Sequence, residues 1–268
     1  MTSASLSAKN RGLSLYLHTI KSGIGLMVAF FLLLFLSGPM PFIIQSLSML
    51  AQRRRDGLVG YANIGEYGSR NFALYLAVAL IGALVIGLIT SSFMHNRQAV
   101  DVYGALPVKR GTLLLSKALG GLTMILIPYL LTTAMFYIAQ GFLQAYENTW
   151  MLWTVNLASY FVYAAAIFII TIFCAVNTGT VFDTAIFSLT MCGAPTIVLL
   201  INRMFFSMTL IGYNSSSQLN NFILGLSPIA MPFKRLMEGG TLKDTNYTIG
   251  SLVLWPIAAV LLLAGAVL

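Results

Sequence analysis

The chain has 268 residues, of which 58% are apolar and 8% are charged, and its 15 basic and seven acidic side chains give a net charge of +8. Soluble domains contain roughly 45–50% apolar and about 25% charged residues. The composition therefore excludes a soluble globular protein and indicates an integral membrane protein. The basic residues flank hydrophobic runs, an arrangement that suits anionic lipid headgroups and topology control and does not suggest nucleic-acid binding.

Six hydrophobic runs reach or approach the ~20 residues that a helix needs to cross ~30 Å of hydrocarbon. The expected spans are residues 23–44, 72–94, 118–143, 151–176, 184–201 and 249–268. Alternating strand patterns are absent, so we expect an all-α integral membrane protein with six transmembrane helices. Residues 1–22 are expected to be a cytoplasmic N-terminal segment, and Pro39 and Pro41 predict that the first span breaks near the far membrane face.

The segments between the spans are predicted to be two tight turns, at 144–150 and 177–183, and three long loops, at 45–71, 95–117 and 202–248. With the N-terminus in the cytoplasm, seven basic residues lie on the inner side and eight on the outer side. The positive-inside rule therefore does not orient the chain. The last span ends without a basic or polar tail, so we expect this sequence to be the front part of a longer chain.

Small residues recur every four positions along the second expected span, at Ala79, Ala83, Gly87 and Ser91. This spacing places them on one helical face, where small side chains allow another helix to approach closely. The stripe predicts tight packing within the chain or, alternatively, a seam between two copies.

Residues 95–117 read HNRQAVDVYGALPVKRGTLLLSK and form the most charged long segment. Its apolar residues follow helical spacing and its polar residues take the other faces: Ala99, Val102, Tyr103 and Leu106 against Arg97, Gln98 and Asp101. This pattern predicts a short amphipathic helix at 96–106 on the membrane surface, ended by Pro107. Such a helix is either an interfacial linker or a docking surface for a cytoplasmic partner.

Part of this segment has the form D-x-Y-x-x-L-P-V-x-R-x-x-L-x-x-S-K. The matching residues are Asp101, Tyr103, Leu106, Pro107, Val108, Arg110, Leu113, Ser116 and Lys117. Together with the six-span layout, the pattern resembles the permease subunit of ABC-2-type transporters from Gram-positive bacteria. Elsewhere the chain matches that family only by hydropathy and loop placement.

The resemblance implies that this segment is a coupling helix seated on a separate cytoplasmic ATP-binding subunit. The implied partner-docking set is Arg97, Asp101, Tyr103, Leu106, Pro107, Val108 and Arg110. Tyr103, Leu106 and Pro107 would supply the apolar contact, and the charged members would pair with charges on the partner. The resemblance also implies a bacterial cell membrane, a cytoplasmic N-terminus and short, broken extracellular helices around Pro228 and Pro232.

The sequence contains no G-x-x-x-x-G-K-[ST] phosphate-binding loop, so this chain is not expected to be the ATPase. We expect a transport subunit that is not an enzyme and has no cofactor of its own, with ATP and Mg bound by the partner. A second permease subunit, identical or related, would complete the pathway for an unidentified amphipathic or peptide-like substrate. The alternative is a non-transporting sensor or interaction subunit of an envelope-stress complex, which binds through the same segment or through 202–248.

Other candidate residues favour structural roles. His18 and His95 lie outside the spans without a second histidine at bundle-facing spacing, so they do not indicate a haem subunit. Asp183 beside Thr180 suits a helix cap better than an intramembrane carboxylate for proton coupling. Arg203 suits an interfacial anchor better than a substrate ligand. Both cysteines lie in apolar runs without a CxxC pattern, and we expect them to be small hydrophobic residues.

Overall fold

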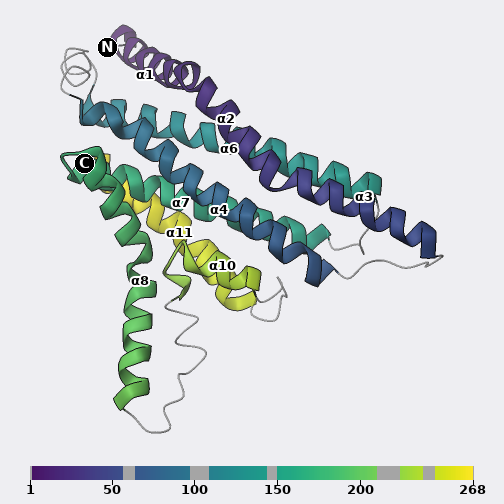
Figure 1. The fold of residues 1–268 in the computed structure, drawn as a ribbon. Helices are drawn as coiled ribbons and strands as arrows, with labels where there is room; N and C mark the ends of the chain where they lie inside the picture. The colour runs from purple at the N-terminus through teal and green to yellow at the C-terminus, as the bar shows by residue number, and fades with distance from the viewer. Residues whose placement is uncertain are drawn as a thin grey trace.

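The computed structural model describes residues 2–56, 64–96, 109–143, 150–209, 224–237 and 245–267, and the regular structure in these ranges is helical. Figure 1 shows the helices running mostly side by side, with one that leaves the group. The helices are α1 (Thr2–Ser22), α2 (Ile24–Ser37), α3 (Pro39–Asp56), α4 (Ile64–Ser91), the 3₁₀ turn η1 (Ser92–Met94), α6 (Arg110–Leu143), α7 (Trp150–Asn177), α8 (Val181–Thr209), α10 (Ala230–Met237) and α11 (Thr245–Val267). The predicted all-α class is confirmed.

Five helical segments in the described ranges are long and apolar enough to cross a membrane, as expected of a multi-pass membrane protein. They are Ile24–Gln52, Phe72–Met94, Arg110–Gly141, Thr154–Asn177 and Val181–Thr209. Each coincides with one of the first five predicted spans. The sixth predicted span lies on α11, whose described apolar stretch, Val253–Ala266, is shorter.

All three predicted long loops are wrong in extent, and in the one expected at 95–117 residues 110–117 belong to α6. The loop expected at 45–71 is helical wherever the structure describes it, and the loop expected at 202–248 contains the end of α8, all of α10 and the start of α11. Leu, Met, Ala, Gln and Arg, which fill the end of α3, are good helix formers in water as well as in lipid. A drop in hydropathy therefore marked the edge of the hydrocarbon layer and not the end of the helix.

The break predicted in the first span is confirmed at Gly38, which separates α2 from α3. Pro39 is the first residue of α3, a position where the missing N–H costs no helical hydrogen bond. A Cβ added to Gly38 would lie 2.5 Å from Cδ2 of Tyr75 and 2.9 Å from Cζ of Phe136. Glycine is needed here because the chain passes directly over two buried aromatic rings.

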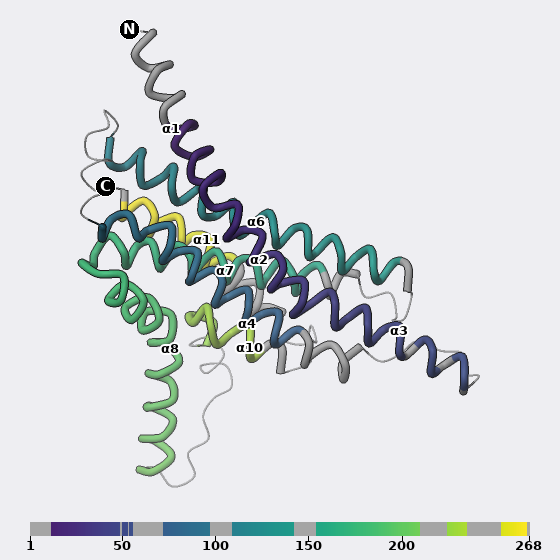
Figure 2. The backbone as a smooth tube through the Cα atoms, turned by 45° about the horizontal axis from the view of Figure 1, so that its top comes forward, coloured from purple at the N-terminus to yellow at the C-terminus, as the bar shows by residue number. Residues whose placement is uncertain are grey.

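Helix direction follows from contacts at two levels of the bundle. α1 and α6 run the same way, because a Cβ on Gly120 would lie 2.8 Å from Cγ2 of Thr19 while Gly12 faces Thr112, eight residues earlier on α6. α4 runs the opposite way, with the Tyr75 hydroxyl 3.0 Å from Thr132 Oγ1 near one end. We call the end where α4 finishes and α6 begins the α4–α6 end. α7 also finishes there and α8 begins there. Figure 1 shows the start of α1 on the same side, and Figures 1 and 2 show the end of α11 there.

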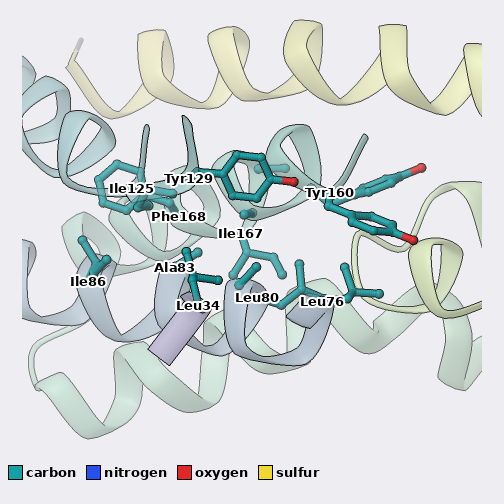
Figure 3. Packing of buried hydrophobic residues seen from close by; sticks show 14 of the residues in the cluster. Leu34, Leu76, Leu80, Ala83, Ile86, Ile125, Tyr129, Tyr160, Ile167 and Phe168 are labelled. Atoms are coloured by element: carbon teal, nitrogen blue, oxygen red, sulfur yellow. The ribbon is translucent and has the colours of Figure 1, made fainter. Parts of the chain in front are cut away.

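α7 lies at the centre of the bundle and packs against α4, α6, α8 and α11. Figure 3 shows side chains of α2, α4, α6 and α7 meeting in one cluster, which includes Leu34, Ala83, Ile125 and Phe168. Lipid tails are as apolar as these side chains, so close van der Waals packing stabilises the cluster more than removal from solvent does.

The small-residue stripe of α4 is buried along its whole length. At Gly87 a Cβ would lie 2.9 Å from Cβ of Thr171 on α7. The stripe therefore lets α4 and α7 approach each other, which confirms packing within the chain.

A short helix, α10, follows α8 and precedes α11 in the chain, in the region around Pro228 and Pro232 where the resemblance implied short helices. Ser227 caps it by accepting a hydrogen bond from the Ala230 N–H at 3.2 Å. Pro228 follows the cap and Pro232 is the third residue of the helix, so neither removes a hydrogen bond from a helix interior.

Candidate functional site

The predicted docking set lies mostly outside the described residues. This applies to Arg97, Asp101, Tyr103, Leu106, Pro107 and Val108. Arg110 is described: it begins α6, and its side chain and that of Lys109 are exposed. A positive charge at a helix N-terminus interacts unfavourably with the helix dipole, and each such charge destabilises the helix by roughly 0.3–1 kcal/mol. These two cations therefore do not stabilise α6 through its dipole.

The two flanks of 97–108 meet the bundle at neighbouring points. On one side α4 continues into η1, and the His95 N–H donates to the Ser92 carbonyl at 3.1 Å. On the other side, the Lys117 Nζ lies 4.5 Å from the centre of the Phe93 ring, a cation–π contact between α6 and η1. The chain thus leaves the bundle and re-enters it at one place on the α4–α6 end.

A chain of side-chain contacts joins this place to the α7–α8 turn. The His95 Nε2 lies 3.2 Å from Thr184 Oγ1, which lies 2.6 Å from Thr178 Oγ1. The same two hydroxyls lie 2.8 Å from the Thr180 carbonyl and 3.0 Å from the Cys174 carbonyl, respectively. Thr184 is fully buried, so its hydroxyl must find its partners within the protein.

Counting protons assigns the donor in this chain of contacts. Two threonine hydroxyls carry two protons, and the contacts with Thr180 and Cys174 carbonyls each need one. If Nε2 of His95 accepts, at most two of the four contacts can be hydrogen bonds. If Nε2–H donates to Thr184, three can. The tautomer with hydrogen on Nε2 therefore satisfies more of the buried polar atoms.

The α7–α8 turn is tight, as predicted, and spans residues 178–180. Thr180 Oγ1 accepts a hydrogen bond from the Asp183 N–H at 3.1 Å, and the Asp183 carboxylate lies in the first turn of α8, where the helix dipole favours negative charge. The predicted capping role of this turn is confirmed. Arg203 is exposed on the second half of α8, and His18 is exposed on α1.

Tyrosine and threonine hydroxyls form a second polar layer between α4, α6 and α7, with two buried bonds and one exposed bond, that of Tyr137. Tyr75 bonds Thr132, Tyr129 donates to the Leu157 carbonyl at 2.6 Å, and Tyr137 bonds Thr154 at 2.7 Å. No acidic or basic side chain takes part in these three bonds, and among the described residues no group of three His, Cys, Asp or Glu could hold a metal ion. Both cysteines are buried and free, as small hydrophobic residues would be. This layer has the form of a packing element.

Sequence reasoning overlooked His95 as a functional residue. Its position outside the spans was predicted, but its side-chain partner, Thr184, lies 89 positions further along the chain. The threonines on either side of a predicted tight turn were the available sign of a polar helix end. That His95 contacts one of these threonines becomes visible only in the structure, where the end of α4 lies beside α7 and α8.

No protein-family model matches this sequence, and no curated protein matches it.

Proposed function

We propose that this chain is the membrane-spanning permease subunit of an ATP-binding cassette transporter of the ABC-2 type. Its docking set, the seven residues named above between Arg97 and Arg110, contacts a separate subunit that binds ATP and Mg. The chain works with a second permease subunit, identical or related, and moves a substrate across the bacterial cell membrane. The observation that carries this proposal is the position of the two flanks of the segment, which meet the same end of the bundle, with Lys109 and Arg110 exposed on the second flank.

The arrangement of the helices supports six crossings with both chain ends and the docking set on one side. An even number of crossings returns a chain to the side from which it started. The start of α1 and the end of α11 lie toward the α4–α6 end (Figure 1), where the flanks of the docking set also lie. In the proposed orientation this end is cytoplasmic, which gives the N-terminus and the docking set access to a cytoplasmic partner.

The contacts of the two flanks favour a coupling role for the segment and are not expected of a passive linker. A linker needs no attachment beyond its covalent ends, but here the flanks are joined by the Phe93–Lys117 contact and tied to the α7–α8 turn by His95. Force applied to the segment would therefore reach four helices. The unfavourable placement of Lys109 and Arg110 at a helix N-terminus is explained if a partner supplies the opposing charge.

Site-specific photocrosslinking tests the proposal. A photoreactive phenylalanine analogue replaces Leu106 in the full chain, which is irradiated in native membranes, and the product is probed with radiolabelled azido-ATP. We expect a labelled cross-linked product. The matched control places the same analogue at Ile81, which is 64% exposed in the middle of α4 and faces lipid, and should give none.

Charge reversal sharpens the same experiment. Arg110→Glu should lower the cross-linking yield at Leu106 at least fivefold, whereas Arg110→Lys and Arg203→Glu should leave it unchanged. A cross-linked partner that does not take up azido-ATP would refute the transporter and favour the sensor or interaction subunit. Absence of any product at Leu106 would refute docking through this segment.

A further inference from the structure

α8 is the least embedded of the five candidate membrane-spanning helices. In its most apolar stretch 22% of the residues are buried, against 67% for α7. Its buried side chains form one narrow line: Thr184, Ser188, Cys192 and Leu199. Every residue from 200 to 209 is exposed. Figures 1 and 2 both show α8 bending away from the other helices.

Among the described residues, hydrogen bonds attach α8 to the rest of the molecule at two places. The first is its base, where Thr184 meets Thr178 and His95. The second is at mid-length, where the Ser227 hydroxyl donates to the Cys192 carbonyl at 2.9 Å. The second attachment is itself fixed, because the indole N–H of Trp255 on α11 donates to the Gly225 carbonyl at 3.1 Å.

The spacing of these attachments makes α8 a lever. At 1.5 Å of rise per residue, about 12 Å of helix separates Thr184 from Cys192, and about 26 Å separates Cys192 from Thr209. A small sideways displacement of the base around the Ser227 attachment therefore becomes a displacement about twice as large, in the opposite direction, at the far end.

Of the contacts at the base, the one from His95 has a distinct role. Thr178 and Thr180 belong to the α7–α8 turn, so their bonds to α8 fix that turn internally. His95 comes from the end of α4, on a different part of the chain. Its contact with Thr184 therefore joins the base of α8 to the end of α4.

We propose that His95 is a positioning residue that sets the direction of α8 through its hydrogen bond to Thr184, with the Ser227–Cys192 bond as the pivot. Breaking the bond from His95 releases the base, and the far end of α8 then samples a wider range of positions. This inference does not depend on the proposed transport activity. If that activity holds, His95 stands two residues before the docking set, so that movement of the set reaches α8 directly.

Distance measurement by double electron–electron resonance in lipid nanodiscs tests the proposal on the full chain. Spin labels are placed at Leu74→Cys on α4 and Met208→Cys near the end of α8, both exposed sites, with the two native cysteines replaced by alanine. We expect His95→Ala to widen the distance distribution at least twofold. His95→Gln should restore the narrow distribution, because the glutamine amide also donates an N–H.

Two further variants and a second label pair separate the loss of this hydrogen bond from a general loss of packing. Thr184→Val, which removes the hydroxyl at nearly constant volume, should widen the distribution as His95→Ala does, and His18→Ala should leave it unchanged. A second label pair, Leu74→Cys with Leu130→Cys, reports on α4 and α6. Unchanged Leu74–Met208 distances in both His95→Ala and Thr184→Val would overturn the proposal. Failure of glutamine to restore the distribution, or equal widening of the Leu74–Leu130 pair, would assign the effect to lost packing and overturn it as well.

Discussion

α7 and α8 follow each other through a three-residue turn and are similar in length, yet the protein uses them in opposite ways. α7 is surrounded by other helices, whereas α8 touches them along one line and then bends away. Large apolar side chains occupy both helices: Phe168 on α7 is fully buried, and Phe205 on α8 is 61% exposed. In water the second arrangement would be costly, but in lipid it is not, because the surroundings are as apolar as the side chain.

The difference teaches where specificity resides in this bundle. Hydrophobicity places both helices in the membrane but does not separate the central helix from the peripheral one. Small residues and hydroxyls make that distinction. α7 meets the small-residue stripe of α4 and the Tyr129 hydroxyl of α6, while α8 bonds other elements at its base and through the Cys192 carbonyl. Substitutions at such contacts should therefore affect the two helices unequally.

The largest effect is expected at the α4–α7 contact. In Gly87→Leu the new Cβ would lie 2.9 Å from Cβ of Thr171, whose hydroxyl is held by the Ile167 carbonyl at 2.8 Å. Since neither helix can yield locally, we expect a loss of about 1–3 kcal/mol in the free energy of unfolding or a failure to fold. Unfolding by sodium dodecyl sulfate in mixed micelles measures it.

Gly193→Leu on α8 is the matched control. A Cβ there would meet only the end of the Ile197 side chain, at 4.0 Å. We expect the free energy of unfolding to change by less than about 0.5 kcal/mol, as for a substitution away from packed contacts. Equal losses at Gly87 and Gly193 would contradict the division between a packed α7 and a peripheral α8.

A smaller effect is expected from the hydroxyl layer. Tyr129→Phe removes the 2.6 Å bond to the Leu157 carbonyl and leaves the ring in place. Hydrogen bonds between membrane helices contribute about 0.6 kcal/mol on average and up to about 1.7 kcal/mol, and we expect a loss in this range in the same unfolding assay. Thr209→Val removes a hydroxyl that, among the described residues, bonds the Phe205 carbonyl of its own helix, and it should have a smaller effect. The reverse order would show that the layer between the helices does not stabilise the bundle.

Hydropathy alone predicted much of the fold. Five of the six expected spans coincide with helices that can cross a membrane, because apolar runs of that length admit few structures in lipid. Helix ends were less predictable, as α3 shows: its Arg-rich end is helical although it is too polar for the hydrocarbon layer. The stripe on α4 predicted a close approach, but only its contact with Thr171 identified α7 as the neighbour.

The candidate site was predicted less completely. The docking set was derived from a motif, and Arg110 is the member of that set that the structure describes. The hydrogen bond from His95 to Thr184 depends on three helices meeting at one end of the bundle. No local pattern encodes such a meeting, since the two residues are 89 positions apart.

The smallest effect on the free energy of unfolding is expected at Pro195, which also separates bending within α8 from movement of the whole helix. Proline lacks the N–H that would bond the Met191 carbonyl, so the helix lacks one backbone bond close to the pivot at Cys192. Pro195→Ala restores that bond and should narrow the Leu74–Met208 distance distribution with a change of less than about 1 kcal/mol in unfolding free energy. His95→Ala should then still widen the distribution in the stiffer helix, because a lever without a compliant point transmits the motion of its base more fully. If Pro195→Ala instead abolishes the response to His95→Ala, the far end of α8 moves by bending at the proline and not by pivoting on Ser227.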